Sequence, residues 1–341
     1  MIISRTPLRI SFVGGGSDLP AFYRNRPGAV VSTSINKYVF ITATHRFDRQ
    51  ICAKYSITET VNDVNELKHE LIREALYMVG LKDSIEITSI SDVPSQGTGL
   101  GSSSTYTVGL LNALYTYIGR SVDAEQLARE ASAIEIERCG KPVGKQDQYI
   151  AAYGGFQFIQ FNPDESVFVE PITCSPLVKD TLQERLIMLY TGMARSANGV
   201  LEEQRDNVEK DHRYRQTLQS MTQLAQDLKE SLCRGDIDVF GDILHENWKL
   251  KQSLATGISN PRINYWYERA RRYGAIGGKV LGAGGGGFLL LYAPVEKHEQ
   301  IKASLPELQY APFRFEPQGS KILHAQESVA PSAHCRRSCI E

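Results

Sequence analysis

The residues best suited to chemistry lie in a glycine- and serine-rich stretch, PSQGTGLGSSS, at residues 94–104. It directly precedes a long apolar segment with the pattern of a buried helix. Backbone without Cβ atoms can wrap closely around a bulky anion, and a helix N-terminus presents free N–H groups and a positive dipole end. The pattern therefore predicts a phosphate cradle, to which the serine hydroxyls add donors and possible metal ligands. A plain loop with a serine N-cap is the alternative.

Two further glycine clusters strengthen the phosphate-binding interpretation. In the first, alternating apolar and polar residues at 8–12 indicate a strand. The strand leads into Gly14–Gly16, and the cluster ends at the carboxylate Asp18. The last cluster, KVLGAGGGG at 279–287, precedes an apolar run typical of a buried strand. Four consecutive glycines cost conformational entropy on ordering, whereas a turn needs only one or two. We therefore expect another group to approach this backbone closely.

Two common nucleotide-binding motifs do not fit the sequence. A P-loop requires G-x-x-x-x-G-K-[ST], but none of the Gly-Lys pairs, at 140–141, 144–145 and 278–279, is followed by Ser or Thr. A dinucleotide-binding fingerprint requires a strand, a glycine loop and then a helix, whereas the loop at 284–287 leads into a predicted strand. We therefore expect a phosphate-binding protein of another design and not a Rossmann dehydrogenase.

In their order and spacing, the three clusters resemble the motifs of the GHMP kinases, which include galactokinase, homoserine kinase and mevalonate kinase. The resemblance rests on Pro7-x-Arg9-x-x-x-x-Gly14-x-x-x-Asp18, on the 94–104 loop and on the 282–287 loop, and it spans most of the chain. It implies an ATP-dependent kinase with two domains and an active-site cleft between them. ATP and Mg²⁺ are then the expected cofactors.

Within the family, the sequence is similar to the heptose 7-phosphate kinases, through residues 5–20, 34–38 and 144–149. This implies phosphorylation of the anomeric hydroxyl of D-glycero-D-manno-heptose 7-phosphate to the 1,7-bisphosphate, in the synthesis of nucleotide-activated heptose for surface glycans. Galactokinases carry Glu-His where this chain has Gly15-Gly16, so the groups that hold a hexose there are missing. An L-fucokinase-like or other sugar 1-kinase is the alternative enzyme. The non-enzymatic alternative is a catalytically silent sugar sensor of the same fold.

The resemblance also implies roles for individual residues. Asp147 is the expected base or orienting group for the sugar hydroxyl, and Arg9 is the positive charge beside it. Ser103 and Glu135 are the expected Mg²⁺ ligands. A silent sensor would have no need of Ser103, Glu135 and Asp147 together, which favours the enzyme. The residues implied to bind ATP are Pro94, Gly97, Gly99, Leu100, Gly101, Ser102, Ser103 and Ser104.

Taken singly, each of these polar residues also has an ordinary interpretation. Asp147 could form an Asx turn, Glu135 could be a solvated helix charge, and Arg9 could lie on a strand surface. Asp18 is expected to hold sugar hydroxyls because a carboxylate accepts several hydrogen bonds, although it could also cap a short turn. The expected substrate site is completed by Gly15, Gly16, Gly284 and Gly285.

A phosphate at the far end of the acceptor requires a second anion site. Four basic residues near the expected site could provide it: Arg138, Lys141, Lys145 and Arg195. We favour Lys145 and Arg195, because Arg195 follows a predicted strand and a guanidinium binds phosphate bidentately.

Length and composition agree with a soluble enzyme that acts on a small molecule. The chain has 341 residues, enough for about two domains. Lys and Arg number 38 against 39 Asp and Glu, a balance that offers no general attraction to nucleic acid or to a membrane surface. The N-terminus does not resemble a signal peptide, and the six scattered cysteines form neither a zinc nor a disulfide framework. We therefore expect a cytoplasmic monomer or homodimer whose partner is a sugar phosphate.

The elements that must position these residues follow from the hydrophobic periodicity. A strand at 84–91 leads into the glycine- and serine-rich loop at 94–104, which we call the phosphate loop. A helix at 103–118 follows it, and a helix at 124–138 carries Glu135. The second half is mainly helical, with strands near 186–190 and 288–293. The predicted fold class is α+β, with mixed sheets and helices packed on one side. The predicted division is an N-terminal domain at 1–178, a C-terminal domain at 179–325 and an accessory tail at 326–341.

Overall fold

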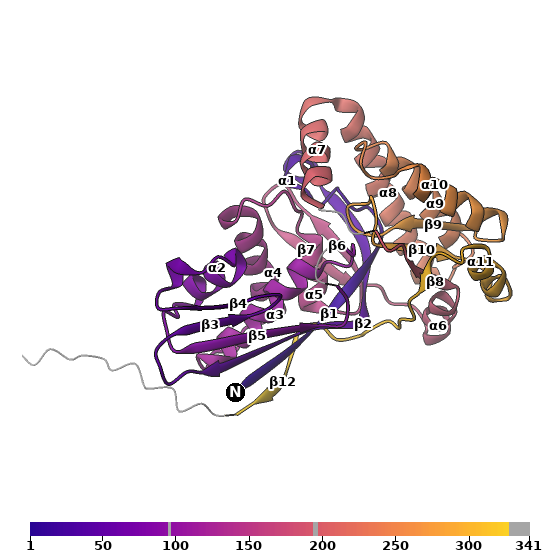
Figure 1. Ribbon diagram of the computed structural model, residues 1–341. Helices are drawn as coiled ribbons and strands as arrows, with labels where there is room; N and C mark the ends of the chain where they lie inside the picture. Colours follow the sequence, from indigo (N-terminus) through magenta and orange to yellow (C-terminus); the bar gives the residue numbers. More distant parts are fainter. Residues whose placement is uncertain (95–96, 194–196, 327–341) are drawn as a thin grey trace, which may run out of the picture.

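A computed structural model describes residues 1–94, 97–193 and 197–326. The larger of its two sheets has eight strands, in the order β12-β1-β2-β5-β3-β4, while β6 pairs with β2 and β7 with β6 (Figure 1). All pairings are antiparallel except that of β3 with β5. The strands are β1 (Ile2–Val13), β2 (Gly28–His45), β3 (Ile51–Lys54), β4 (Thr58–Val61), β5 (Ile85–Ser91), β6 (Phe156–Phe161), β7 (Val167–Pro171) and β12 (Lys321–Ala325).

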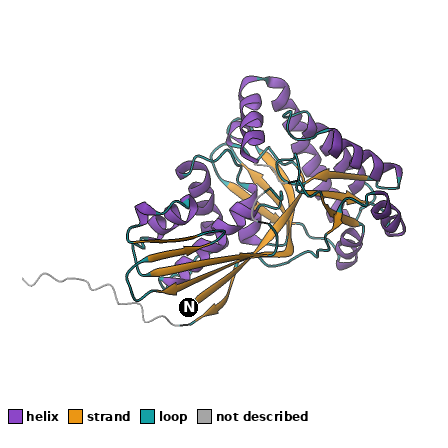
Figure 2. Ribbon diagram, in the orientation of Figure 1, coloured by secondary structure: helices purple, strands orange, loops and turns teal. Residues whose placement is uncertain are grey.

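Helices α2 (Glu70–Val79), α3 (Ser102–Tyr117), α4 (Ala124–Ser132) and α5 (Gln146–Tyr153) pack together beside this sheet (Figures 1 and 2). The central one, α3, is apolar on nearly all sides, and it is buried between the sheet and the other helices. Its close approach to β1 depends on Gly109, where a Cβ would lie 2.7 Å from the Thr6 hydroxyl. The N-terminus of α3 is thereby held at a fixed place over the sheet.

The second sheet has four antiparallel strands in the order β11-β8-β10-β9. Its core is built around Trp248 and Trp266, which are among the largest fully buried side chains. Helix α8 packs against β1 and β2 of the first sheet, whereas α9 packs against β9 of the second. The elements are β8 (Leu186–Tyr190), β9 (Gly277–Val280), β10 (Phe288–Tyr292), β11 (Gln309–Tyr310), α6 (Pro176–Glu184), α7 (Ala197–Lys210), α8 (His212–Arg234), α9 (Phe240–Gln252), α10 (Pro261–Arg272) and α11 (His298–Ser304).

The predicted α+β class, with mixed sheets and helices, is confirmed. The chain also returns to the first sheet near its end, because β12 pairs with β1 and Phe315 bridges to Ile35. The predicted helical second half includes α7 and α8 as two separate helices, and Asp211 caps the second by accepting the Arg213 N–H. None of the described helices is long and apolar enough to cross a membrane.

The helix predicted at 124–138 changes its winding partway along. It is α-helical to Ser132 and π-helical over Ala133–Arg138. A π-helical turn is rare and is found mostly at functional sites. This turn places Glu135, which is fully buried, against the beginning of α3.

Candidate active site

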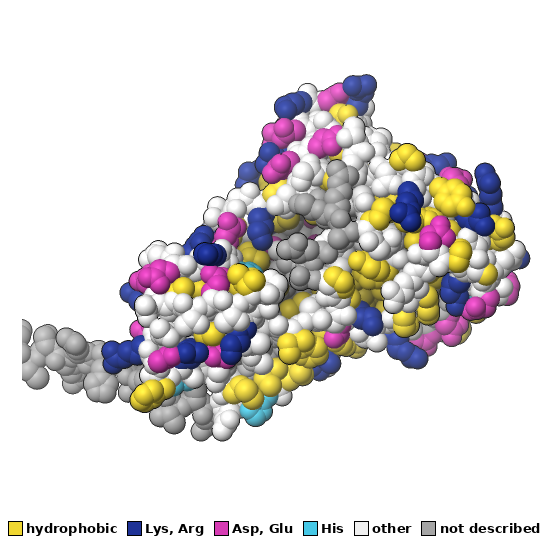
Figure 3. Space-filling model, in the orientation of Figure 1, with side chains coloured by type: hydrophobic (Ala, Val, Ile, Leu, Met, Phe, Trp, Pro, Cys, Tyr) yellow, Lys and Arg dark blue, Asp and Glu magenta, His cyan; other side chains and the backbone are white. Residues whose placement is uncertain are grey.

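A cavity of about 860 Å³ lies between the two sheets and is lined by all three glycine clusters. On the face shown in Figure 3, the surface is hollowed between the left and right halves of the molecule. Acidic and basic side chains are interspersed over both halves of that face, in keeping with the near-zero net charge. The chemistry of this cavity is therefore decided by a few inward-facing groups and not by a charged surface.

The first and most regular feature of the cavity is the phosphate loop. Its residues from Gly97 to Ser104, Leu100 excepted, line the cavity and lead into the N-terminus of α3. Gly101 has φ +77°, and its missing Cβ leaves room for Arg9 and Asp147, whose nearest atoms would lie 3.2–3.3 Å away. Leu100 is buried and its carbonyl accepts the Arg9 N–H at 3.1 Å, while Pro94 lies outside the lining.

The last glycine cluster packs directly on this loop, backbone against backbone. A Cβ on Gly99 would lie 2.3 Å from the Leu281 carbonyl oxygen, and one on Gly287 would lie 2.4 Å from that of Thr98. The close approach expected at the four glycines is therefore made, in large part, by the protein's own backbone. Gly284 and Gly285, predicted to bind substrate, pack on Ile258; the residues of this loop that line the cavity are Gly282 and Ala283.

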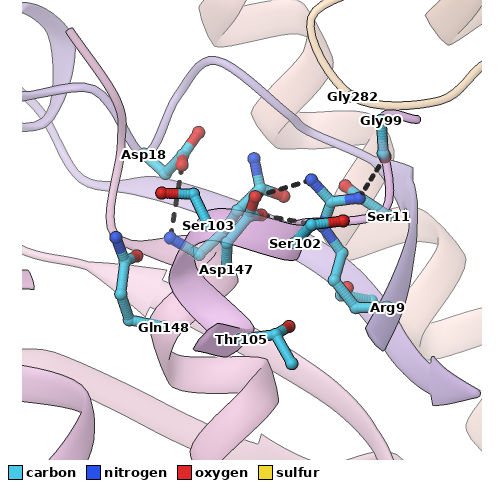
Figure 4. Close-up of polar contacts among 12 residues, drawn as sticks. Arg9, Ser11, Asp18, Gly99, Ser102, Ser103, Thr105, Asp147, Gln148 and Gly282 are labelled. Carbon is cyan, nitrogen blue, oxygen red and sulfur yellow. Dashed lines mark hydrogen bonds and ion pairs between the residues drawn. The ribbon is translucent and has the colours of Figure 1, made fainter. Parts of the chain in front are cut away.

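Arg9 and Asp147 form a bidentate pair at the mouth of the phosphate loop (Figure 4). The Arg9 Nε and Nη2 atoms donate to the two carboxylate oxygens of Asp147, each at 2.7 Å, and Nη1 donates to the Gly99 carbonyl at 2.5 Å. The Arg9 side chain is 4% exposed and that of Asp147 is 21% exposed. The guanidinium is thus fixed between the loop and the aspartate, and the carboxylate remains accessible from the cavity.

Asp18 lies on the other side of Asp147 and is almost fully buried. Its carboxylate accepts N–H groups from Gly16 at 2.9 Å and from Gln146 at 3.3 Å. Burial raises the pKa of Asp18, and the nearby Asp147 carboxylate raises it further. A Cβ on Gly144 would lie 2.0 Å from an Asp18 oxygen, so that the glycine is required for this approach. Asp18 therefore holds two loops of the site together while it faces the cavity.

Glu135 and Ser103 meet beside the N-terminus of α3. The Ser103 hydroxyl donates to one carboxylate oxygen of Glu135, and the Gln148 amide donates to the other at 2.6 Å. Lys141 approaches both groups, with its Nζ 3.3 Å from the Ser103 hydroxyl and 3.8 Å from Glu135. A buried carboxylate beside a hydroxyl that faces the phosphate loop is a donor set suited to a hard cation.

An aromatic cluster that sequence reasoning missed lines the far end of the cavity. The His69 ring lies 4.5 Å from that of Tyr55 and 5.3 Å from that of Tyr106. Val39 and Ile90 add apolar surface. Burial lowers the pKa of His69, and Lys141 lowers it further. The cluster is therefore largely neutral and flat-sided, which suits a heteroaromatic ring.

Of the basic groups predicted for a distal phosphate, Lys141 lines the cavity, whereas Lys145 and Arg138 do not. The Lys145 ammonium lies 2.5 Å from Glu165 and over the Tyr23 ring, and the residue is not part of the cavity lining. Burial alone would raise the pKa of Glu165, but its hydrogen bonds, the one from Lys145 foremost, hold it at about 2. Arg138 lies 3.8 Å from Glu74. Arg195 is outside the described residues, although Ala197 and Asn198, close behind it, line the cavity.

Two buried lysines line the cavity that sequence reasoning also missed. Lys279 Nζ donates to the carbonyls of Ser11 and Phe12, at 2.8 and 3.0 Å, and burial lowers its pKa well below 10.5. Lys251 Nζ donates to the Gly282 carbonyl at 2.6 Å. Burial, aided by the charge of Arg9, lowers the pKa of Lys251 to about 8. For Lys251, the available signal was a lysine three residues after Trp248, which places both on the same face of α9.

Comparisons with known proteins show which proteins this chain is similar to. The family model for the GHMP kinases N terminal domain matches residues 64–155, and that for the GHMP kinases C terminal matches residues 228–310. The chain is 31% identical to the D-glycero-alpha-D-manno-heptose 7-phosphate kinase of Campylobacter jejuni, over 94% of this chain and 98% of that protein. It is 28% identical to the bifunctional fucokinase/GDP-fucose pyrophosphorylase of Arabidopsis thaliana, over 88% of this chain but 31% of that protein.

A likeness to solved structures extends over the whole fold. The structure of a D-glycero-D-manno-heptose 1-phosphate kinase from Bacteroides thetaiotaomicron superposes with a TM-score of 0.78 at 25% identity. The match covers 96% of this chain and 100% of that one. The fold as a whole therefore has a counterpart in a protein with a related name.

Proposed function

The chain belongs to the GHMP kinases, and on that premise we propose that it transfers the terminal phosphoryl group of ATP to the anomeric hydroxyl of D-glycero-D-manno-heptose 7-phosphate. The observation that carries the proposal is the Arg9–Asp147 pair, held at the mouth of a phosphate loop and open to a cavity of about 860 Å³. Phosphoryl transfer is catalysed chiefly by positioning and by compensating charge, and this arrangement provides both.

The proposal places ATP along the cavity. The N–H groups at the start of α3 and the glycines of the phosphate loop suit the phosphate chain. The ring cluster of Tyr55, His69 and Tyr106 suits the purine. This orientation directs the terminal phosphate toward Asp147, because Gly101 lies in contact distance of its carboxylate.

The acceptor hydroxyl is placed at the Asp147 carboxylate. The bond between the terminal phosphorus and its bridging oxygen breaks, a bond from the acceptor oxygen to that phosphorus forms, and the hydroxyl proton passes to an Asp147 oxygen. Arg9 keeps the carboxylate in one orientation and supplies positive charge next to the transferred group. Because the transition state is loose, Asp147 contributes chiefly by orienting the hydroxyl.

The donor set of Ser103 and Glu135 fits Mg²⁺. One oxygen of the buried Glu135 carboxylate accepts from the Ser103 hydroxyl, so two oxygen ligands already lie together. Mg²⁺ takes few protein oxygens and keeps several waters, and Gln148 keeps the carboxylate oriented from behind. A bound Mg²⁺ would neutralise charge on the ATP phosphates. Lys141 adds a further positive charge at the same place.

The choice of sugar rests on the similarity to the Campylobacter jejuni protein over nearly the whole of both chains. The L-fucokinase alternative rests on a lower identity, 28%, to a relative of which the match covers only 31%. The space that side chains at Gly15 and Gly16 would fill is bordered by groups from α7 and α9, so the two glycines alone do not open room for a larger sugar. For the distal phosphate, Arg195 stays the expected residue from the sequence, because Lys145 is engaged by Glu165.

A coupled ADP-release assay with ATP and Mg²⁺ tests the proposal on a panel of acceptors: the heptose 7-phosphate, mannose, L-fucose, galactose and mevalonate. Turnover of the heptose phosphate alone is the expected result. Turnover of a neutral sugar, with the heptose phosphate inert, would keep the kinase chemistry and reject the substrate. No turnover with any acceptor, while ATP still binds, would favour the silent sensor.

A further inference from the structure

A lysine and a glutamine from helices of the second half lie over the glycines of the first cluster. A Cβ on Gly15 would lie 3.7 Å from Lys251 Nζ, and a Cβ on Gly16 would lie 2.3 Å from Gln204 Nε2. Lys251 comes from α9 and Gln204 from α7, and both residues line the cavity. Their polar groups therefore take the place of the side chains that these glycines lack.

Both groups have hydrogen-bond donors to spare. Gln204 is 1% exposed and Lys251 is 6% exposed. Among the described residues, Gln204 Nε2 has no hydrogen-bond partner, and Lys251 Nζ donates to the Gly282 carbonyl. An ammonium carries three N–H groups, and a buried donor without a partner costs free energy. Donors left unused at the wall of a cavity are the arrangement expected where a ligand supplies the acceptors.

The position of Lys251 indicates which part of the ligand it meets. Its charge interacts with those of Arg9, Asp18 and Asp147. Arg9 and Asp147 mark the reacting end of the acceptor, next to the phosphate loop. Lys251 is also anchored to Gly282, whose loop packs on that same phosphate loop. It therefore lies near the acceptor's reacting hydroxyl and not near a distal phosphate.

On the basis of the kinase function above, we propose that Lys251 and Gln204 bind the acceptor sugar by donating hydrogen bonds to oxygen atoms next to the hydroxyl that is phosphorylated. They determine specificity for the acceptor and have no part in binding ATP. A sugar that presents oxygen acceptors to both groups would be selected over one that presents an apolar carbon there, because the buried donors would then stay unpaired.

Calorimetric binding without turnover tests this assignment. The probes are D-glycero-D-manno-heptose 7-phosphate, the same heptose without its phosphate, and a non-hydrolysable ATP analogue. In Lys251→Met, the dissociation constants of both sugars should rise by about tenfold or more, and in Gln204→Leu by a smaller factor. The affinity for the ATP analogue should stay within about twofold. Lys249→Met, an exposed lysine on the same helix, is the matched control and should change nothing.

Three outcomes would overturn the assignment. Equal weakening of sugar and ATP analogue would indicate a general structural role. Weakening of the phosphorylated heptose alone would place Lys251 at the distal phosphate. Unchanged sugar affinity would remove both residues from the acceptor site. Removing one buried charge that faces Asp18 and Asp147 is itself destabilising, so the melting temperature of Lys251→Met is measured alongside binding. Lys251→Arg, which keeps the charge, is the second variant and should retain sugar affinity better than Lys251→Met.

The inference and the proposed function fail separately. If the wild type phosphorylates another sugar of the panel, the function is corrected and the same variants are measured with that sugar, with the same expectations. If the wild type phosphorylates the heptose 7-phosphate and Lys251→Met binds it normally, only the inference fails. If no sugar is bound or phosphorylated, both fail.

Discussion

Arg9 and Asp147 are 138 residues apart in the sequence, yet both carboxylate oxygens of Asp147 lie 2.7 Å from nitrogen atoms of the Arg9 guanidinium. A bidentate pair of this kind fixes the plane of the carboxylate as well as its position. The third nitrogen of Arg9 is bonded to the phosphate loop through Gly99. Consequently the group that we propose to orient the acceptor and the loop that we propose to bind ATP are linked through one guanidinium.

Replacing Asp147 by Asn should abolish most turnover while ATP binding persists. The amide keeps the size of the side chain but accepts only through one oxygen and places an NH₂ group against the Arg9 donors. We expect kcat to fall by about 10²–10⁴-fold. Steady-state kinetics with the acceptor measure kcat, and calorimetry with an ATP analogue measures the affinity for the nucleotide. A variant with near-normal kcat would rule Asp147 out of the reaction.

Replacing Gly99 by Ala should loosen the contact between the two glycine loops. The new Cβ would lie 2.3 Å from the Leu281 carbonyl, on a residue with φ +76°. We expect unfolding free energy to fall by about 2–4 kcal/mol. Gly119→Ala is the matched control, since Gly119 also has φ +76° but nothing lies within 4 Å of its Cβ position. Its cost should be about 1–2 kcal/mol from the backbone alone. Equal losses in denaturant titrations would contradict the clash.

Activity should decline as pH rises above about 8. Lys251, with a pKa lowered to about 8, is charged below that pH and becomes neutral above it. We expect kcat/KM for the acceptor to approach a tenfold fall per pH unit there. The charged groups that face Lys251 are Arg9, Asp18, Asp147 and Lys279. Arginine keeps its charge, so Lys251→Arg should abolish the decline. A decline retained in that variant would exclude Lys251 as its source.

Replacing Glu135 by Gln should raise the concentration of Mg²⁺ needed for activity by about tenfold or more, because a neutral amide is a poorer ligand for a hard cation. Titration of kcat/KM against Mg²⁺ gives the first readout. Binding of Mn²⁺ in the presence of ADP, followed by electron paramagnetic resonance, gives a second that is independent of turnover. Glu137→Gln, two residues further along the π-helical turn, is the control. Unchanged Mn²⁺ affinity in Glu135→Gln would exclude the carboxylate as a ligand.

Replacing Arg195 by Ala should raise KM for the heptose 7-phosphate far more than KM for ATP, by about tenfold against less than twofold. The corresponding Lys145→Ala variant should leave both constants nearly unchanged, because Lys145 is held by Glu165 outside the cavity lining. Initial-rate kinetics with either substrate varied would distinguish the two. Equal effects of Arg195→Ala on both KM values would contradict a distal phosphate site at this residue.

Much of the site was predictable because its chemistry is encoded in short segments. The PSQGTGLGSSS loop requires positive φ angles at Gly97, Gly99 and Gly101, and the adjoining apolar segment forms α3 by its own periodicity. Arg9 and Asp147 were identified by family resemblance, and the structure brings them together as that resemblance implied. The α+β class likewise followed from periodicity and is confirmed.

Other features were decided by tertiary structure, because they depend on which distant segments meet. Lys251 is an ordinary lysine of an amphipathic helix until α9 packs against β9 and directs its ammonium beside Gly15. Lys145 forms an ion pair with Glu165 and does not line the cavity. The four glycines near residue 285 accommodate the backbones of Thr98, Met193 and Ile258.

Local sequence therefore determined the glycine loops and the helix that follows the first of them, and it indicated the candidate reactive residues. Long-range packing determined which charges are buried together and which donors remain unused. The physical reason is that backbone conformation depends mainly on near neighbours in the chain, whereas the burial and pairing of a charged side chain depend on groups that only folding brings within a few ångströms.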